Sequence, residues 1–161
     1  MFTSLNEEPI RAIFKLYPWE WLLHDRFGSH VAGAPTRWIQ PAWRLLLSSK
    51  ELLALLWEMF PGHPNLLAAS RMPGQSGGPE IAKPVFGREG ANIIAPGFTT
   101  DGPYAGSATV YQAYRELPCF GVRYPVIGSW IVAGQAAGIG IREDATPITQ
   151  NTSQFVPHYF R

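Results

Sequence analysis

The sequence predicts an α+β fold with a largely antiparallel sheet and a few flanking helices. Strand-like segments gather after residue 80 and follow one another closely, as strands joined by hairpins do. Helical patterns are confined to the part before residue 71. Charged residues make up only 16% of the chain and there are six tryptophans, whereas about 25% charged residues is usual. We therefore expect an incomplete fold, in which part of the surface packs against further chain.

The first seventy residues are expected to be mainly helical. Residues 10–15 read as a strand. Pro18 suits the first turn of a helix that runs to about Phe27 and stops at Gly28. Residues 37–43 read as an extended segment broken by proline.

A second helix is expected from Ser49 to Phe60. Ser48 and Glu51 have the spacing of a capping box ahead of an apolar run. Lys50 then lies in the first turn, where the helix dipole disfavours a cation. The position suits a lysine that reaches an anion, although a solvated lysine is the better interpretation of this segment when it is taken alone.

The remainder of the chain is expected to be rich in strands. Residues 71–80 form a polar linker that divides the helical part, 1–70, from the strand-rich part, 81–161. Residues 133–135 suit a hairpin turn between the last two strands. The expected strands cover residues 81–83, 93–94, 109–112, 126–132 and 136–141.

A loop with two glycines follows the first of these strands. Lys83 ends the strand, and Gly87 and Gly90 flank Arg88 and Glu89. Glycine lets the backbone approach a ligand closely, and a lysine at the root of the loop supplies a point charge for phosphate. The segment fits a flexible lid over the phosphates of a nucleotide, but glycine-rich hairpins are more often simple turns.

Alternation along residues 138–144 places two glycines beside an arginine. Side chains in a strand point to opposite faces in turn, so Gly138, Gly140, Arg142 and Asp144 share one face. The isoleucines at 139 and 141 then pack inward. The glycine face is a floor for a flat or phosphorylated ligand that Arg142 could bind bidentately. An Arg142–Asp144 surface pair is an equally good interpretation of this segment alone.

Composition excludes several classes of function. The net charge of +1 predicts no attraction to nucleic acid or to an anionic membrane. Apolar runs are too short to span a bilayer, and the chain opens with no leader. Cys119 is the single cysteine, which excludes a disulfide framework and a cysteine-based metal site. A cytoplasmic protein of one domain is the default expectation.

Taken in order, these segments resemble the C-terminal part of glutathionylspermidine synthase-like proteins. The resemblance covers almost the whole chain and is closest to stand-alone members without an amidase domain. It implies an ATP-grasp fold and ATP-dependent amide bond formation through an acyl phosphate. The runs that carry it are FKLYPWEW at 14–21, SK at 49–50, KP at 83–84, GREGAN at 87–92, PVIGSW at 125–130, AGIGIRED at 137–144 and NTSQFVPH at 151–158.

The resemblance implies roles for individual residues. Arg142 matches the catalytic arginine that holds the transferred phosphoryl group or the acyl phosphate. ATP phosphates would be contacted by Lys50 and Lys83. The lid would comprise Gly87, Arg88, Glu89 and Gly90. The backbone that receives adenine would belong to Tyr111, Gln112, Ala113 and Tyr114.

The chain departs from the family in its metal ligands. The family's Mg²⁺ ligands, an aspartate and an acidic-x-asparagine pair, lie upstream of every segment present here, and no Glu-x-Asn or Asp-x-Asn occurs in this sequence. We expect no metal ligands within this chain. Glutathione-binding serines of the family are absent too. Met1 is therefore expected to be an internal or misassigned start, and the chain to pack against a missing N-terminal region.

Three functions stay open at this point. The first is the ATP-binding part of a carboxylate–amine ligase, whose partners by inheritance are a glutathione-like peptide and a polyamine-like amine. A non-catalytic nucleotide-binding or interaction module is the second. The third is a truncated fragment without activity.

Overall fold

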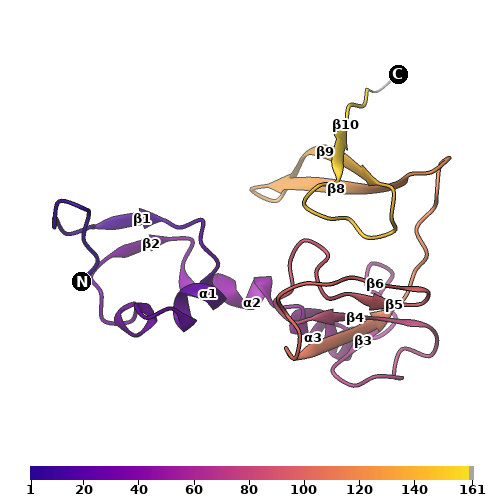
Figure 1. The fold of residues 1–161 in the computed structure, drawn as a ribbon, viewed down its shortest axis with the longest axis horizontal. Coiled ribbons are helices and arrows are strands. Elements are labelled where there is room, and N and C mark those ends of the chain that lie inside the picture. The colour runs from indigo at the N-terminus through magenta and orange to yellow at the C-terminus, as the bar shows by residue number, and fades with distance from the viewer. Residues whose placement is uncertain (160–161) are drawn as a thin grey trace. The chain divides into compact units, whose positions relative to one another are not determined.

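A computed structural model describes residues 1–159 and divides the chain into two compact units, Met1–Leu52 and Leu53–Arg161 (Figure 1). Residues 160–161 of the expected strand-rich part lie outside the described range. Mostly antiparallel sheets and a few short helices confirm the α+β class. Among the described residues, no helix is both long enough and apolar enough to cross a membrane.

The first unit is built around a parallel pair of short strands. Strand β1 (Ala12–Phe14) pairs with β2 (Arg37–Ile39), and helix α1 (Trp19–His24) lies between them in the sequence. Trp19 is only 4% exposed and meets Trp38 edge to face at 5.3 Å between ring centroids. This aromatic contact forms the centre of the unit.

Helix α1 is shorter than the sequence predicts. The prediction of a helix to Phe27 is wrong, because the backbone becomes extended at Asp25 (φ −69°, ψ 156°). Gly28 instead begins the short 3₁₀ helix η1 (Gly28–His30). A Cβ on Gly28 would lie 2.4 Å from the carbonyl oxygen of Leu23, so glycine is needed here for close packing against the end of α1 and not as a helix cap.

The extended run expected at 37–43 is shorter in the structure, because a helical turn begins within it. Strand β2 ends at Ile39, and a 3₁₀ helix, η2 (Ala42–Arg44), follows Pro41. It leads directly into helix α2 (Leu45–Ser48), which the sequence prediction missed.

The long helix of the chain, α3 (Glu51–Met59), begins just after Lys50. Its cap is Ser49, whose hydroxyl accepts a hydrogen bond from the Glu51 N–H at 3.2 Å. The expected capping box with Ser48 is wrong, because the Ser48 hydroxyl donates to the Leu45 carbonyl of the preceding helix at 2.9 Å. Because Ser49 is the cap, Lys50 is the first residue after it and lies at the start of the first turn, as the sequence predicts.

The second unit contains an antiparallel five-stranded sheet in the order β3-β7-β4-β5-β6. Val110 at its centre is completely buried. Residues 71–79 form a loop that joins two strands of this one sheet, so the change between units falls at Leu52–Leu53 instead. The strands are β3 (Ala69–Ser70), β4 (Glu80–Pro84), β5 (Ile94–Ala95), β6 (Phe98–Thr99) and β7 (Thr109–Ala113).

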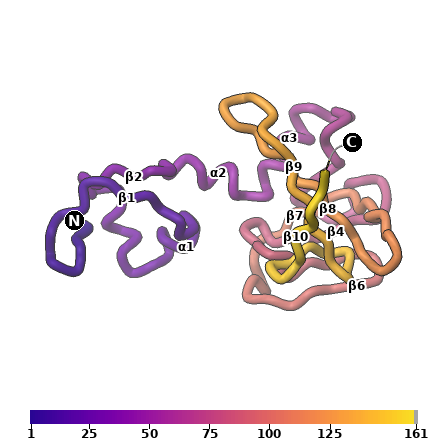
Figure 2. The backbone as a smooth tube through the Cα atoms, turned by 90° about the horizontal axis from the view of Figure 1, so that it is seen from above, coloured from indigo at the N-terminus to yellow at the C-terminus, as the bar shows by residue number. Residues whose placement is uncertain are grey.

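A three-stranded antiparallel sheet completes the second unit. Strands β8 (Tyr124–Val132) and β9 (Gln135–Asp144) form a long hairpin, and β10 (Gln154–Val156) pairs with β9 (Figure 2). The hairpin turn has two residues, Ala133 (φ 50°) and Gly134 (φ 80°), as the twist of paired strands favours. Ile139 remains 36% exposed, so the expectation that it packs inward is wrong.

Candidate functional site

A cavity of about 330 Å³ lies in the second unit, beside strands β4 and β7. Its volume is within the range of small-molecule sites. The cavity brings together five residues that the sequence analysis singled out from three separate segments. These residues are Lys83, Gly90, Gln112, Ala113 and Tyr114.

The pairing of β4 with β7 explains why the side chains of Lys83 and Gln112 meet. Ile81 lies opposite Gln112, and Lys83 lies opposite Val110. Residues paired in this way point to the same face of the sheet. Tyr111 alternates to the opposite face of β7 and is not part of the cavity lining.

Lys83 and Gln112 are joined directly within the cavity. The Lys83 ammonium donates a hydrogen bond to the Gln112 amide oxygen at 2.8 Å. Gln112 is 8% exposed. The amide therefore holds the charge at one wall of the cavity without neutralising it.

The backbone of β7 is already committed to the sheet. Strand β7 pairs with β3 on one side and β4 on the other. Beyond this pairing, the Ala113 N–H donates to the Ala68 carbonyl and the Tyr114 N–H to the Pro79 carbonyl, both at 2.8 Å. The next segment, 115–117, follows the end of the strand, and Arg115 and Leu117 line the cavity.

The glycine-rich loop after β4 closes onto the cavity at Gly90. Its turns are held by bonds from the Gly87 N–H to the Pro84 carbonyl (3.0 Å) and from the Ala91 N–H to the Arg88 carbonyl (2.9 Å). Gly90 has φ +72°, and a Cβ there would lie 2.5 Å from Cγ2 of Ile148. Arg88 and Glu89 are exposed at the tip of the loop.

The opposite wall of the cavity comes from residues 147–149, in the loop between β9 and β10. Sequence reasoning missed these residues, because the contact between Ile148 and Gly90 joins segments almost sixty positions apart. No periodic pattern or motif marked Pro147 or Thr149 as ligand-facing.

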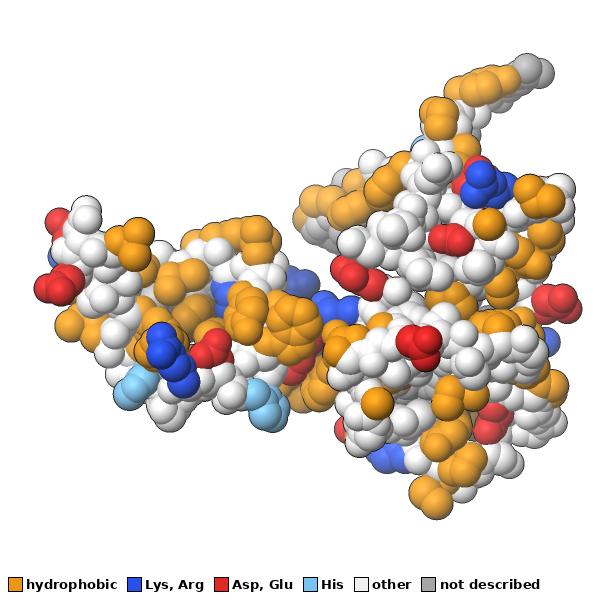
Figure 3. All heavy atoms as spheres, viewed as in Figure 1, with side chains coloured by type: hydrophobic (Ala, Val, Ile, Leu, Met, Phe, Trp, Pro, Cys, Tyr) orange, Lys and Arg blue, Asp and Glu red, His pale blue; other side chains and the backbone are white. Residues whose placement is uncertain are grey.

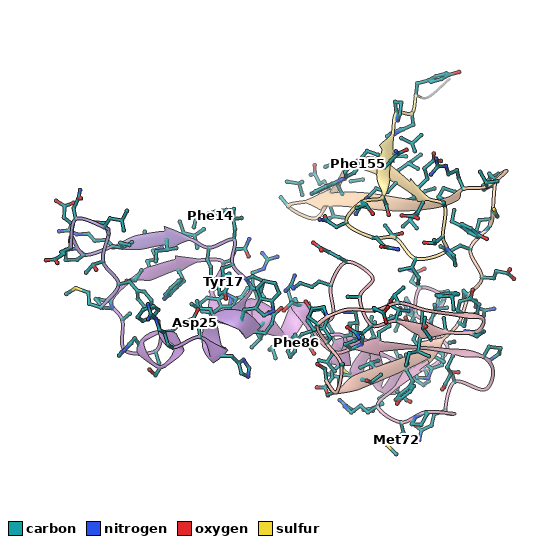
Figure 4. The ribbon with its side chains drawn as sticks, in the orientation of Figure 1. Phe14, Tyr17, Asp25, Met72, Phe86 and Phe155 are labelled. Atoms are coloured by element: carbon teal, nitrogen blue, oxygen red, sulfur yellow. The ribbon has the colours of Figure 1, made fainter. Side chains whose placement is uncertain are left out.

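A second cavity, of about 410 Å³, lies over the β8–β9 hairpin. Gly128 and Gly140 face each other across the two strands and leave its floor without side chains. Arg142 lines it together with Trp130 and Phe155, and Phe155 is labelled on β10 in Figure 4. Thr149 lines both cavities.

The Arg142 guanidinium binds the loop between β9 and β10. Its Nη2 group donates to the carbonyl of Gln150 at 2.5 Å, and more weakly to those of Ser153 (3.3 Å) and Asn151 (3.4 Å). The guanidinium also lies 5.3 Å from the centre of the Phe155 ring. Arg142 thus shapes the wall that the two cavities share.

Asp144 holds the same loop from the other side. It accepts hydrogen bonds from the Ser153 hydroxyl at 2.5 Å and the Thr146 N–H at 3.0 Å. These donors, Ser153 first, keep the pKa of Asp144 below its ordinary value. Among the described residues, Arg142 and Asp144 bind the loop and not each other, so the surface pair considered from the sequence does not form.

Two sequence expectations lie outside these cavities. Lys50 belongs to the first unit, so its phosphate role stays a prediction from the resemblance. Within residues 1–159, no group of three or more histidine, cysteine, aspartate or glutamate side chains could hold a metal ion.

Comparison with known proteins identifies the family. The sequence profile described as glutathionylspermidine synthase preATP-grasp matches residues 1–161. A putative acid–amine ligase of Haemophilus influenzae is 46% identical over 175 residues, which cover 99% of this chain and 44% of that protein. Two Crithidia fasciculata proteins are more distant: a glutathionylspermidine synthase (24% identical, 94% of this chain, 30% of that protein) and a trypanothione synthetase (26%, 91% and 27%).

The chain spans less than half the length of each of these relatives. The profile nevertheless covers every position of the sequence, including both cavities. The chain therefore belongs to the glutathionylspermidine synthase preATP-grasp family.

Proposed function

We propose that this chain is the ATP-binding part of an ATP-dependent carboxylate–amine ligase with an ATP-grasp fold. One observation carries the proposal: a single cavity gathers Lys83, Gly90 and the end of β7, three features that the resemblance assigns to ATP. The ammonium of Lys83 suits phosphate oxygens, and apolar neighbours such as Ile81, Ile93 and Phe98 suit a purine ring.

Different residues of the cavity bind different parts of the nucleotide. Lys83 binds phosphate, and Gly90 lets the loop backbone approach it closely. Since the N–H groups of Ala113 and Tyr114 donate within the sheet, the adenine edge is bound by the backbone of residues 115–117. The adenine-binding backbone is therefore placed just after the segment expected from the sequence, residues 111–114.

The second cavity binds the carboxylic acid substrate. The carboxylate of the acid substrate would attack the γ-phosphorus of ATP, and ADP would leave. The amine would then attack the resulting acyl phosphate and displace phosphate. Thr149 borders both cavities, and Arg142 stabilises the charge of the phosphoryl group there. The names of the relatives indicate a glutathione-like acid and a polyamine-like amine as the substrate classes.

The magnesium that the resemblance implies does not fit residues 1–159. The described chain offers no cluster of three acidic, histidine or cysteine side chains for it.

Calorimetric titration of the chain with ATP tests the proposal. Lys83→Ala is expected to weaken ATP binding about tenfold or more, because a hydrogen bond to a charged group contributes about 1.5–3 kcal/mol. Arg71→Ala is the matched control, since it removes a cation of the same unit from a surface ion pair with Glu58 at 2.9 Å, outside the cavity lining. Equal binding by the wild-type chain and Lys83→Ala would contradict the proposal.

Phosphate release separates the ligase from the module considered from the sequence. Glutathione and spermidine are added to the full-length protein together with ATP, and phosphate release is measured. If the protein binds ATP but releases no phosphate in response to these substrates, it is a non-catalytic nucleotide-binding module. Absence of ATP binding would leave the fragment without activity.

A further inference from the structure

The Gln112 side chain has no part in the family resemblance, which assigns only its backbone. The side chain is 8% exposed and lines the first cavity. Its backbone is fixed by strand pairing with Ala69 on one side and Ile81 on the other. The amide is thus presented to the cavity from an interior strand of the sheet.

The bond to Lys83 determines which way the amide faces. An ammonium group has only donors, so the Gln112 group at 2.8 Å from it is the carbonyl oxygen. The amide NH₂ is then turned away from the lysine. The residue paired with Gln112 on β4 is Ile81, whose side chain offers no acceptor to the two amide donors.

We infer that Gln112 is a positioning residue for Lys83 and a neutral donor to the same anionic ligand. The inference rests on the proposed function for the identity of that ligand, a nucleotide polyphosphate. A lysine side chain has four rotatable bonds, and holding its ammonium in place removes an entropic cost that binding would otherwise include. Because the amide is neutral, the bond to Gln112 orients the Lys83 ammonium without offsetting its charge.

A carboxylate in the same place would have the opposite effect on binding. Gln112→Glu retains the shape of the side chain and strengthens its bond to Lys83. It also neutralises the ammonium and replaces two donors by acceptors that repel phosphate. Gln112→Leu removes the bond and leaves the charge. Gln112→Leu therefore tests the orientation of the Lys83 ammonium, and Gln112→Glu tests whether its charge is available to an anion.

The orientation of Lys83 can be measured without any nucleotide. The chain has only three lysines, Lys15, Lys50 and Lys83, so each ¹H–¹⁵N ammonium signal can be assigned by a lysine-to-arginine change. The Lys83 signal is expected to be sharp in the wild-type chain and in Gln112→Glu, and to broaden in Gln112→Leu. An unchanged Lys83 signal in Gln112→Leu would overturn the positioning role.

Titrations with ATP and with adenosine test the second half of the inference. Gln112→Glu is expected to weaken ATP binding about tenfold or more while adenosine binding and the melting temperature stay near those of the wild type. A merely structural glutamine would lead to equal changes for both ligands, and that result would overturn the inference. A wild-type chain that binds no ATP overturns the proposed function, and the ammonium signals still decide the role of Gln112.

Discussion

Gly90 packs against the loop between β9 and β10. Its φ of +72° and the 2.5 Å separation between a Cβ and Ile148 Cγ2 mean that alanine meets two penalties there. Positive φ costs a non-glycine residue roughly 1–2 kcal/mol, and overpacking adds about 1–3 kcal/mol. Gly90→Ala should therefore destabilise the chain by about 2–5 kcal/mol in urea denaturation.

Gly106 provides the control for this substitution. It has φ +76° and nothing within 4 Å of a Cβ, so Gly106→Ala incurs only the backbone penalty. A similar free energy of unfolding for the two variants would show that the contact between Gly90 and Ile148 does not constrain the loop.

The loop between β9 and β10 is the element on which both cavities depend, and Asp144 is one of its two anchors. A carboxyl whose pKa is lower in the folded than in the unfolded chain stabilises the fold above the unfolded-state pKa, about 3.9. That stabilisation is lost as the pH falls through the folded-state pKa. The melting temperature of the wild type should therefore exceed that of Asp144→Asn above about pH 5, and the difference should shrink below about pH 4.

Two further variants support and control this measurement. Ser153→Ala removes the first donor to Asp144 and should reproduce part of the effect with the same pH dependence. Asp101→Asn, at an exposed position, controls for the loss of one negative charge. A difference between wild type and Asp144→Asn that is constant from pH 3 to pH 8 would rule out the carboxylate as the anchor.

Elements with local signals were predictable from the sequence. The β8–β9 hairpin follows from alternation and from Ala133-Gly134 at its turn, and β4 follows from the short apolar run before Lys83, although the strand extends one residue further, to Pro84. The sequence predicts helix α1 too long, because no residue near Asp25 signals a stop. It also predicts the cap of α3 at Ser48, one residue before the observed cap at Ser49. Each of these errors concerns a boundary, which tertiary contacts decide.

Features made by distant residues were not predictable. The bond between Lys83 and Gln112 joins positions 29 apart, and the wall at residues 147–149 meets Gly90 only through the fold. A single sequence marks which residues have suitable chemistry, and it carries no signal for which of them become neighbours. Gln112 was noted for its backbone, whereas its side chain is the part that reaches the cavity.

Many large hydrophobic side chains of the described residues are exposed, and hydrophobic atoms cover part of the face shown in Figure 3. In the second unit they concentrate on the three-stranded sheet, where Ile127 and Trp130 are each 67% exposed and Phe155 is 77% exposed. Exposed apolar patches of this kind bind other hydrophobic surfaces or lead to aggregation. The low charge of the chain, with a net value of +1, gives little electrostatic repulsion to oppose association.

The end of the β8–β9 hairpin provides a test of this property. Ile131 and Val132 are each 61% exposed, so Ile131→Thr with Val132→Lys should change the free energy of unfolding by less than about 0.5 kcal/mol. The double variant should bind less of the dye ANS and scatter less light at high concentration, because it interrupts the apolar patch and adds a charge. Leu5→Thr, at a fully exposed residue of the first unit, controls for loss of one isolated apolar side chain. If Leu5→Thr reduced dye binding and scattering as much as the double variant, association would depend on total apolar exposure and not on the hairpin.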